Sequence, residues 1–315
     1  MRPAMSRMNT SKSQRGQSMV ITLLFLTVLL GMAAAVIDVG AWYRAHRQTQ
    51  STADATALAG AQVLPHSGNA TALALDYADR NGGGVNAGDV TFTSEREASD
   101  TIHVTARRTV PGLFTKLLGI SSVTARATAA ARTSPMGEAK YAAPIGVDYR
   151  HEKLHCNAAL NCNPEFGVDT AIDFNKVGPG AFKLINIDSS HGGVSPKTLG
   201  DWMLNGLDAY MDVNQWYYSD PGMKPNSANF QNALDQRFGP GKELLLPIYN
   251  DTRGDGAGFD YHVVGWAGYQ VTSYDINGSK DAFIFGKFVE IIWEGIQSEH
   301  GGEPDFGARS VELVQ

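Results

Sequence analysis

The chain lacks most of the short motifs that mark an enzyme. It has no G-x-S-x-G stretch, so a Ser-His-Asp hydrolase has no nucleophile candidate. Its glycine runs, Gly82–Gly84 and G-P-G, have neither the spacing nor the lysine of a phosphate-binding loop. Asp251, Asp255 and Asp260 lack the alternate acids and the closing glutamate of a calcium-binding EF-hand, so a hairpin turn is the better interpretation. We therefore expect no catalytic residues and no cofactor.

The folded part of the chain also lacks a basic excess. Residues 1–40 carry a net charge of +3, and the remaining 275 residues carry −9. A nucleic-acid-binding protein needs a basic face on its folded part, so this class is excluded. A basic N-terminus on an acidic body instead indicates membrane topology.

Charge is absent altogether from Ser18 to Ile37. Twenty apolar residues in a helix span about 30 Å, the thickness of a bilayer core. Arg2, Arg7, Lys12 and Arg15 precede this segment, so the positive-inside rule places residues 1–17 in the cytoplasm and the bulk of the chain outside. The alternative is a cleaved signal peptide, since the run 33–35 is Ala-Ala-Ala, but the apolar run is longer than usual.

Helical character continues beyond the apolar segment as far as Leu64, before Pro65. Ala53, Ala57 and Ala61 are four residues apart and form a face of small side chains. Such a face lets a second helix approach closely. We expect this face to pack against the helices of other subunits.

The residues 151–156 read HEKLHC, which matches the H-E-x-x-H pattern of zinc peptidases. In that pattern His151 and His155 bind the metal and Glu152 is the general base. The pattern requires a helix, and Asp148 could cap one. It also requires a third ligand, for which the candidates are Glu165, His191 and His262, although none of them lies at a recognised spacing. We expect no metal here and keep the peptidase as an alternative.

The two cysteines, Cys156 and Cys162, close a small loop if they pair, as expected of an exported domain. The alternative is two unpaired thiols. Trp216, Tyr217 and Tyr218 form an aromatic cluster that is core filling if buried and a glycan- or envelope-binding surface if exposed.

Residues 15–64 resemble the N-terminal segment of TadE/TadG-like proteins of the Flp (tight adherence) pilus. The resemblance is carried by a basic leader ending in Arg15-Gly16, the apolar helix and the positions that follow it: Asp38, Gly40, Tyr43, Gln50, Ala53, Asp54, Ala57 and Ala59. It weakens but persists to about residue 132. It implies a pilin-like, single-pass protein, with possible leader processing between Gly16 and Gln17. The chain departs from the family in two ways. Pilin processing sites usually carry a glutamate five residues into the mature chain, where this chain has Ile21. Long TadG proteins also contain a von Willebrand-type module with an Asp-x-Ser-x-Ser metal motif, but the stretch that begins at Asp188 has Gly192 in the last place, so we expect no such module.

The patterning predicts an α+β protein with a substantial mixed or antiparallel sheet outside the membrane. The expected parts are a leader (1–17), a membrane helix continuing as an alanine-rich helix (18–64), a small α-β-β-α-β unit (65–132), a linker (133–140) and a C-terminal α+β domain (141–315). The predicted function is a pilin-like structural or assembly component of a Flp-type pilus or secretion apparatus. Its partners would be the membrane and other pilus components, and any small-molecule ligand is unknown.

Overall fold

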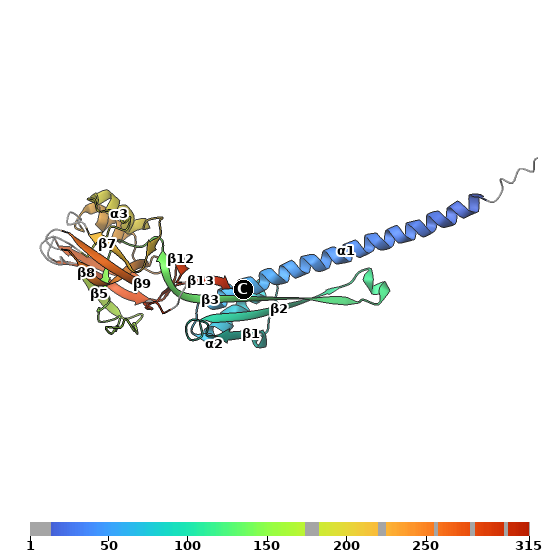
Figure 1. Ribbon diagram of the computed structural model, residues 1–315, viewed down its shortest axis with the longest axis horizontal. Coiled ribbons are helices and arrows are strands. Elements are labelled where there is room, and N and C mark those ends of the chain that lie inside the picture. The colour runs from blue at the N-terminus through green and yellow to red at the C-terminus, as the bar shows by residue number, and fades with distance from the viewer. Residues whose placement is uncertain are drawn as a thin grey trace, which may run out of the picture.

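The computed structural model describes residues 14–173, 183–219, 225–254, 258–277, 281–298 and 302–314. In chain order the elements are α1 (Gln14–Ala61), α2 (Ser67–Arg80), η1 (Ala87–Asp89), β1 (Val90–Thr93), β2 (Thr101–Pro111), η2 (Thr115–Leu118), β3 (Ser122–Ala139), β4 (Val147–Asp148), β5 (Asp169–Asp173), α3 (Pro196–Asn205), β6 (Met211–Asp212), β7 (Gln215–Ser219), α4 (Ala228–Asp235), β8 (Leu244–Arg253), β9 (Phe259–Asn277), β10 (Asp281–Val289), β11 (Ile291–Ile292), β12 (Gly295–Gln297) and β13 (Ala308–Val314). The described chain is elongated, with α1 projecting from one end and a globular lobe at the other (Figure 1). The predicted α+β class with a long N-terminal helix is confirmed.

Helix α1 has 48 residues and is about 70 Å long. It is long and apolar enough to cross a membrane, and side chains in its apolar part are exposed. The hydroxyls of Thr22 and Thr27 donate to the carbonyls of Ser18 and Leu23 one turn earlier, at 2.8 and 2.7 Å. These two hydroxyls of the apolar part are thus hydrogen-bonded inside the helix, as a lipid environment requires.

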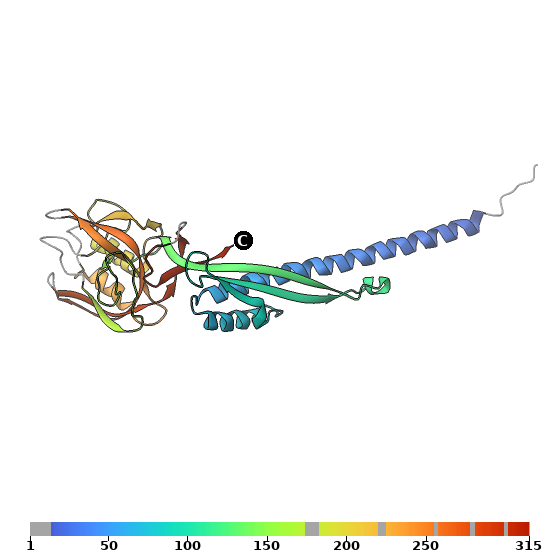
Figure 2. The same cartoon turned by 60° about the horizontal axis from the view of Figure 1, so that its bottom comes forward.

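The second half of α1 belongs to a stalk domain, which we define as residues 38–139 with β13. Its sheet has the strand order β1-β2-β3-β13-β11, antiparallel except for the parallel pair β13–β11. The long β2–β3 hairpin runs alongside α1, and α2 lies against the other end of that helix (Figure 2). The core between them consists largely of alanine, so the helices and the sheet lie close together.

The predicted linker at 133–140 is wrong. Strand β3 is 18 residues long and continues through this segment, pairing with β13 and then with β12 and β6. The indole N–H of Trp266 donates to the Met136 carbonyl at 3.1 Å, and that of Trp293 donates to the Lys140 carbonyl at 2.8 Å. Because of these bonds the strand joins the two lobes without an intervening loop.

Three smaller expectations are also corrected. The second helix of the predicted α-β-β-α-β unit is the short 3₁₀ turn η2 at the hairpin tip. Strand β13, expected in the C-terminal domain, lies in the stalk sheet instead, because its residues Arg309–Val314 pair with β3. The first helix ends at Ala61, three residues before the predicted Leu64.

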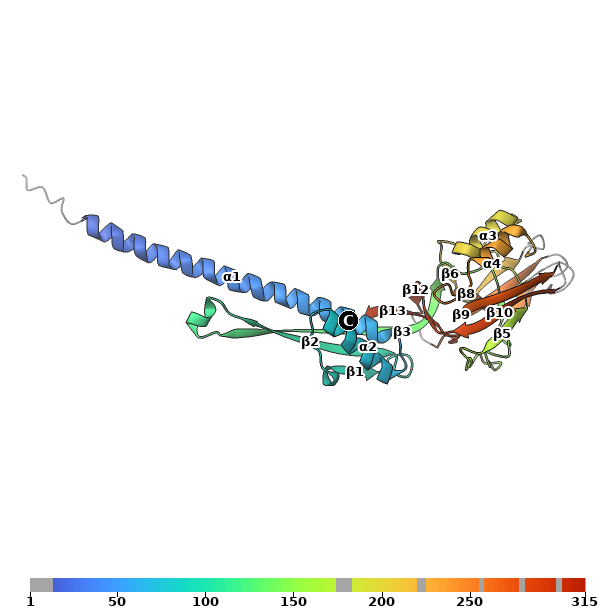
Figure 3. The ribbon, with the colours of Figure 1, turned by 180° about the vertical axis from the view of Figure 1, so that it is seen from behind.

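The globular lobe, which we call the distal domain (residues 141–289), is built on the antiparallel strands β8, β9 and β10. Helices α3 and α4 pack together on one side of this sheet (Figure 3). Ser195 and Ser227 cap them, each hydroxyl accepting a backbone N–H of the first turn. The core contains large aromatic side chains, among them Tyr261, Trp266 and Tyr269.

The loop between β1 and β2 folds around Asp100, which is 2% exposed. Its carboxylate accepts the backbone N–H groups of Glu95, Arg96 and Glu97 and the hydroxyl of Thr101. Burial raises the pKa of Asp100, but these hydrogen bonds outweigh it, and the pKa lies below its ordinary value.

A carboxyl group with a lowered folded-state pKa stabilises the fold above its unfolded pKa, and this contribution is lost as pH falls through the folded value. We therefore expect Asp100→Asn to lower the melting temperature of the stalk domain at pH 7. The difference from wild type should shrink between about pH 5 and pH 2. Thermal unfolding across this range measures it, and a constant difference would contradict the role assigned to the charge.

Candidate functional site

Asp38 joins α1 to the tip of the β2–β3 hairpin. Its side chain is charged, yet it is only 1% exposed. Its carboxylate accepts the backbone N–H groups of Leu113, Phe114 and Thr115 at 3.1, 2.9 and 2.7 Å, and the Thr115 hydroxyl at 2.8 Å. The turn η2 has no side-chain cap of its own, so Asp38 supplies one from 75 residues away. The outer end of the apolar helix and the hairpin tip are thereby held together.

An open apolar hollow of about 520 Å³ lies beside this anchor. It is formed by α1 residues between Leu30 and Ile37 and by Phe114, Thr115 and Leu117 of the tip. The tip therefore lies beside the last two turns of the predicted membrane segment and not above them.

Gln50 makes a second connection between α1 and the hairpin. Its amide N–H donates to the Asp54 carboxylate at 2.7 Å and to the Thr128 carbonyl of β3 at 3.2 Å. Two other motif residues face outward: Tyr43 is 62% exposed, and a Cβ at Gly40 meets nothing within 4 Å. The motif thus divides between residues that fasten the stalk domain and residues that face the surroundings.

The alanine face of α1 is already occupied by the chain itself. Ala53, Ala57 and Ala61 are fully buried, as is Ala59 to within 2%. Their neighbours in the core include the matching face of α2: Ala70, Ala74 and Ala78. The expectation that this face packs against other pilin-like subunits is therefore corrected, because α2 and strand β2 cover it.

The HEKLHC segment does not form the helix that a zinc peptidase needs. Residues 149–155 are turn and irregular chain, and His155 has a φ of 45°. Nε2 of His151 lies 3.1 Å from the Ala171 carbonyl, whereas Nε2 of His155 lies 3.2 Å from Glu165. Within the described ranges, no group of three or more His, Cys, Asp or Glu side chains is placed to hold a metal ion. The described residues therefore give the zinc-peptidase alternative no support.

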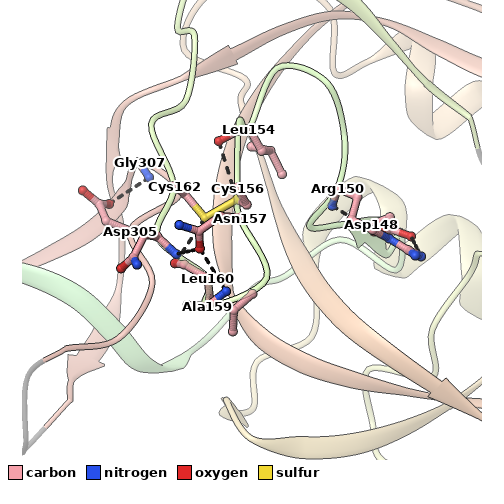
Figure 4. Close-up of a disulfide and its surroundings, with 11 residues drawn as sticks. Asp148, Arg150, Leu154, Cys156, Asn157, Ala159, Leu160, Cys162, Asp305 and Gly307 are labelled. Atoms are coloured by element: carbon pink, nitrogen blue, oxygen red, sulfur yellow. Dashed lines mark hydrogen bonds and ion pairs between the residues drawn. A yellow bond between two sulfur atoms is a disulfide. The ribbon is translucent and has the colours of Figure 1, made fainter.

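Cys156 and Cys162 form a disulfide (Figure 4). Inside the loop that it closes, the Asn157 side-chain oxygen accepts the backbone N–H groups of Ala159 and Asn161 at 2.9 and 3.1 Å. The predicted pairing is confirmed.

Removing this disulfide should destabilise the distal domain modestly, because it closes a short loop. A separation of six residues corresponds to about 2 kcal/mol of lost chain entropy in the unfolded state. We expect Cys156→Ser/Cys162→Ser to lower the free energy of unfolding by about that amount. Denaturant unfolding measures it, and reduction of the wild type should give the same shift. An unchanged midpoint in both experiments would contradict the prediction.

Trp216 is half-buried and not available as an open stacking platform. The guanidinium of Arg253 lies 4.3 Å from its ring centre, and the His262 ring lies 4.9 Å away. Its neighbour Tyr217 is 3% exposed. The glycan-binding alternative, which needed an exposed cluster, therefore has no support here.

The family described as Tad, putative Flp pilus-assembly TadE/G-like, matches residues 16–63. This segment is TadE/G-like. The resemblance predicted from the sequence motifs is confirmed, and the match coincides with α1 and its Asp38, Gln50 and alanine positions. No curated protein and no solved structure matches the chain. The TadE/G-like match indicates a role related to Flp pilus assembly.

The sequence reasoning missed the hairpin tip as the partner of Asp38. A signal was present, since the stretch GLFTKLLGI is apolar yet follows a strand and contains two glycines. Gly16 and Gln17, the predicted processing site, lie in the first turn of α1, and processing there stays a prediction. The remainder of the predicted leader, residues 1–13, lies outside the described residues.

Proposed function

We propose that the chain is a single-pass, pilin-like structural component of a Flp-type pilus or secretion apparatus that acts by protein association. One observation carries the proposal. Within the TadE/G-like segment, one face of the helix after Ile37 is buried in the core of the stalk domain, whereas the apolar residues before Asp38 are exposed. The matched segment thus couples an apolar helix to a folded stalk.

The direction of insertion follows from charge. The basic leader stays in the cytoplasm by the positive-inside rule, and the stalk and distal domains lie outside. Ser18 and Ile37 bound the membrane segment in this arrangement. The disulfide supports it, since disulfides persist in oxidising compartments.

The burial pattern favours the apolar part of α1 as the part that meets other subunits. The alanine face is covered by the chain itself, whereas the segment 18–37 is exposed and free for helix association. At Gly31 a Cβ would meet nothing within 4 Å beyond the helix's own backbone, so another helix can approach closely there.

Site-directed photo-crosslinking in cells that assemble the pilus tests this function. A photoreactive residue at Leu26, which is 51% exposed, should give adducts with other pilus components. The matched control is Tyr77 on α2, where the proposal predicts none. Normal piliation of a strain that lacks the protein, or adducts with non-pilus proteins alone, would overturn it.

The fate of the leader is tested separately by sequencing the N-terminus of the mature protein. A start at Gln17 indicates pilin-type processing and an intact start a retained leader, and both keep the helix as an anchor. A start at Val36 indicates a cleaved signal peptide and contradicts the anchored arrangement.

A further inference from the structure

The hairpin tip, residues 112–121, presents large apolar side chains to the outside. Leu113 is 64% exposed, Phe114 42%, Leu117 87% and Ile120 45%. Clustered exposure of this kind marks an interaction site on a folded domain.

The position of the tip limits which kind of partner its apolar side chains can reach. Asp38 holds it to α1, and Phe114 and Leu117 line the same open hollow as Leu30 and Ile37. Both sets of apolar side chains therefore lie at one level along the helix. If residues 18–37 are in a bilayer, the tip is at its outer boundary.

The backbone of the tip is suited to a medium poor in water. Three consecutive N–H groups donate to Asp38, as described above. Those of Leu117, Gly119 and Ile120 donate to the carbonyls of Phe114, Lys116 and Thr115 at 3.0, 3.2 and 3.0 Å. Moving this turn into lipid therefore exposes few unpaired polar groups, which is the main cost for an irregular loop.

Apart from Asp38, whose carboxylate is buried against the tip, the charges of the neighbouring segments are basic. Segments 39–53 and 101–131 together contain six Lys or Arg residues and no Asp or Glu, in a chain whose net charge is −6. Of these basic side chains, Arg107 pairs with Asp89 and Arg108 donates to the Gly82 carbonyl. The other four are exposed: Arg44, Arg47, Lys116 and Arg126. Arg44 and Arg47 lie six and nine residues beyond Asp38, about 9 and 14 Å along the helix. This is the depth of lipid headgroups, where basic residues attract anionic phosphates.

We propose that the β2–β3 hairpin tip is a second membrane contact of this protein, inserted into the outer leaflet of the bilayer that α1 crosses. Leu113, Phe114, Leu117 and Ile120 lie among the upper acyl chains, and the surrounding basic residues lie at the phosphates. The inference rests on the membrane-spanning arrangement of the proposed function. Two contacts, one helical and one hairpin, fix how the stalk stands on the membrane.

Depth-dependent fluorescence quenching tests the contact. The full-length chain, with its native disulfide intact, is reconstituted into phosphatidylcholine–phosphatidylglycerol vesicles whose acyl chains carry a nitroxide quencher. Each variant carries one added cysteine, labelled with an environment-sensitive fluorophore: Leu117→Cys at the tip, Leu26→Cys in the membrane segment, or Gly68→Cys on α2. Gly68 is exposed, and a Cβ there meets nothing within 4 Å. We expect quenching at positions 26 and 117 to exceed that at position 68 by about twofold or more.

Each other outcome contradicts either the hairpin contact or the membrane-spanning arrangement. Quenching at position 26 but not at 117 overturns the hairpin contact and leaves the membrane helix intact. Quenching at neither position overturns both. Self-quenching at 117 that is relieved by unlabelled protein, with no effect of the lipid quencher, shows that the tip meets a second copy and overturns the lipid contact.

A second variant separates insertion from folding. Because Leu117 is 87% exposed, Leu117→Asp leaves the fold in place. With the fluorophore at Ile120→Cys, this change should reduce lipid quenching to the level of position 68. Undiminished quenching would show that the apolar side chains do not hold the tip in the bilayer, and would overturn the proposal.

Discussion

Replacing Asp38 by alanine is expected to release the β2–β3 hairpin tip from α1. The variant removes the acceptor of four hydrogen bonds, three of them from consecutive backbone N–H groups that have no other acceptor among the hydrogen bonds of the described residues. Hydrogen bonds to a charged acceptor are the stronger kind, so amide hydrogen exchange at Leu113, Phe114 and Thr115 should accelerate by roughly tenfold or more. Exchange mass spectrometry of the full chain in detergent measures it.

Two controls make the Asp38 result specific. Asp76→Ala removes an exposed carboxylate that pairs with Arg80 one turn away on α2, and it should leave the tip unchanged. Asp38→Asn keeps one acceptor oxygen without the charge and should fall between wild type and alanine. Equal exchange at the tip in wild type and Asp38→Ala would show that the anchor contributes nothing.

Replacing Gly60 by leucine is expected to separate α2 from α1. A Cβ at Gly60 would lie 3.2 Å from both the Ala70 carbonyl oxygen and the Ala74 Cβ, and still closer to the Ile102 side chain. A leucine must therefore displace α2 or strand β2, at a cost of about 1–3 kcal/mol in the free energy of unfolding. Thermal or denaturant unfolding of the full chain in detergent, followed by circular dichroism, measures the loss.

Gly40→Leu is the matched control in the same helix, because a Cβ there meets nothing within 4 Å. Since glycine is a poor helix former, this variant should be as stable as wild type or slightly more stable. If both leucine variants lose the same stability, the close approach at Gly60 is not the cause.

The alanine spacing shows what local pattern can and cannot predict. A repeat of four places Ala53, Ala57 and Ala61 on one helix face, and this much follows from helix geometry alone. Which surface covers that face depends on where the chain returns, and here it returns within the same molecule as α2. The pattern Ala70, Ala74 and Ala78 was equally visible in the sequence and would have suggested the pairing.

Long-range pairing explains the other differences. Pro135 and Gly137 favoured a linker, because both weaken an isolated strand. In the structure Pro135 pairs with Arg309 of β13, a segment more than 170 residues later that no local pattern connects to β3. Likewise, Asp38 was recognised as a motif position, but its partners lie 75 to 77 residues away.

The uninterrupted course of β3 has a mechanical consequence. In the proposed arrangement, a force that pulls the distal domain away from the membrane is transmitted along this strand, which runs along the long axis of the described chain (Figure 1). Because the hydrogen bonds to β2 and β13 run perpendicular to the strands, they bear such a force in shear and share it among all their pairs. The stalk domain should therefore be stiff under tension. With no flexible linker between the two domains, a displacement of the distal domain is transmitted along β3 to the hairpin tip.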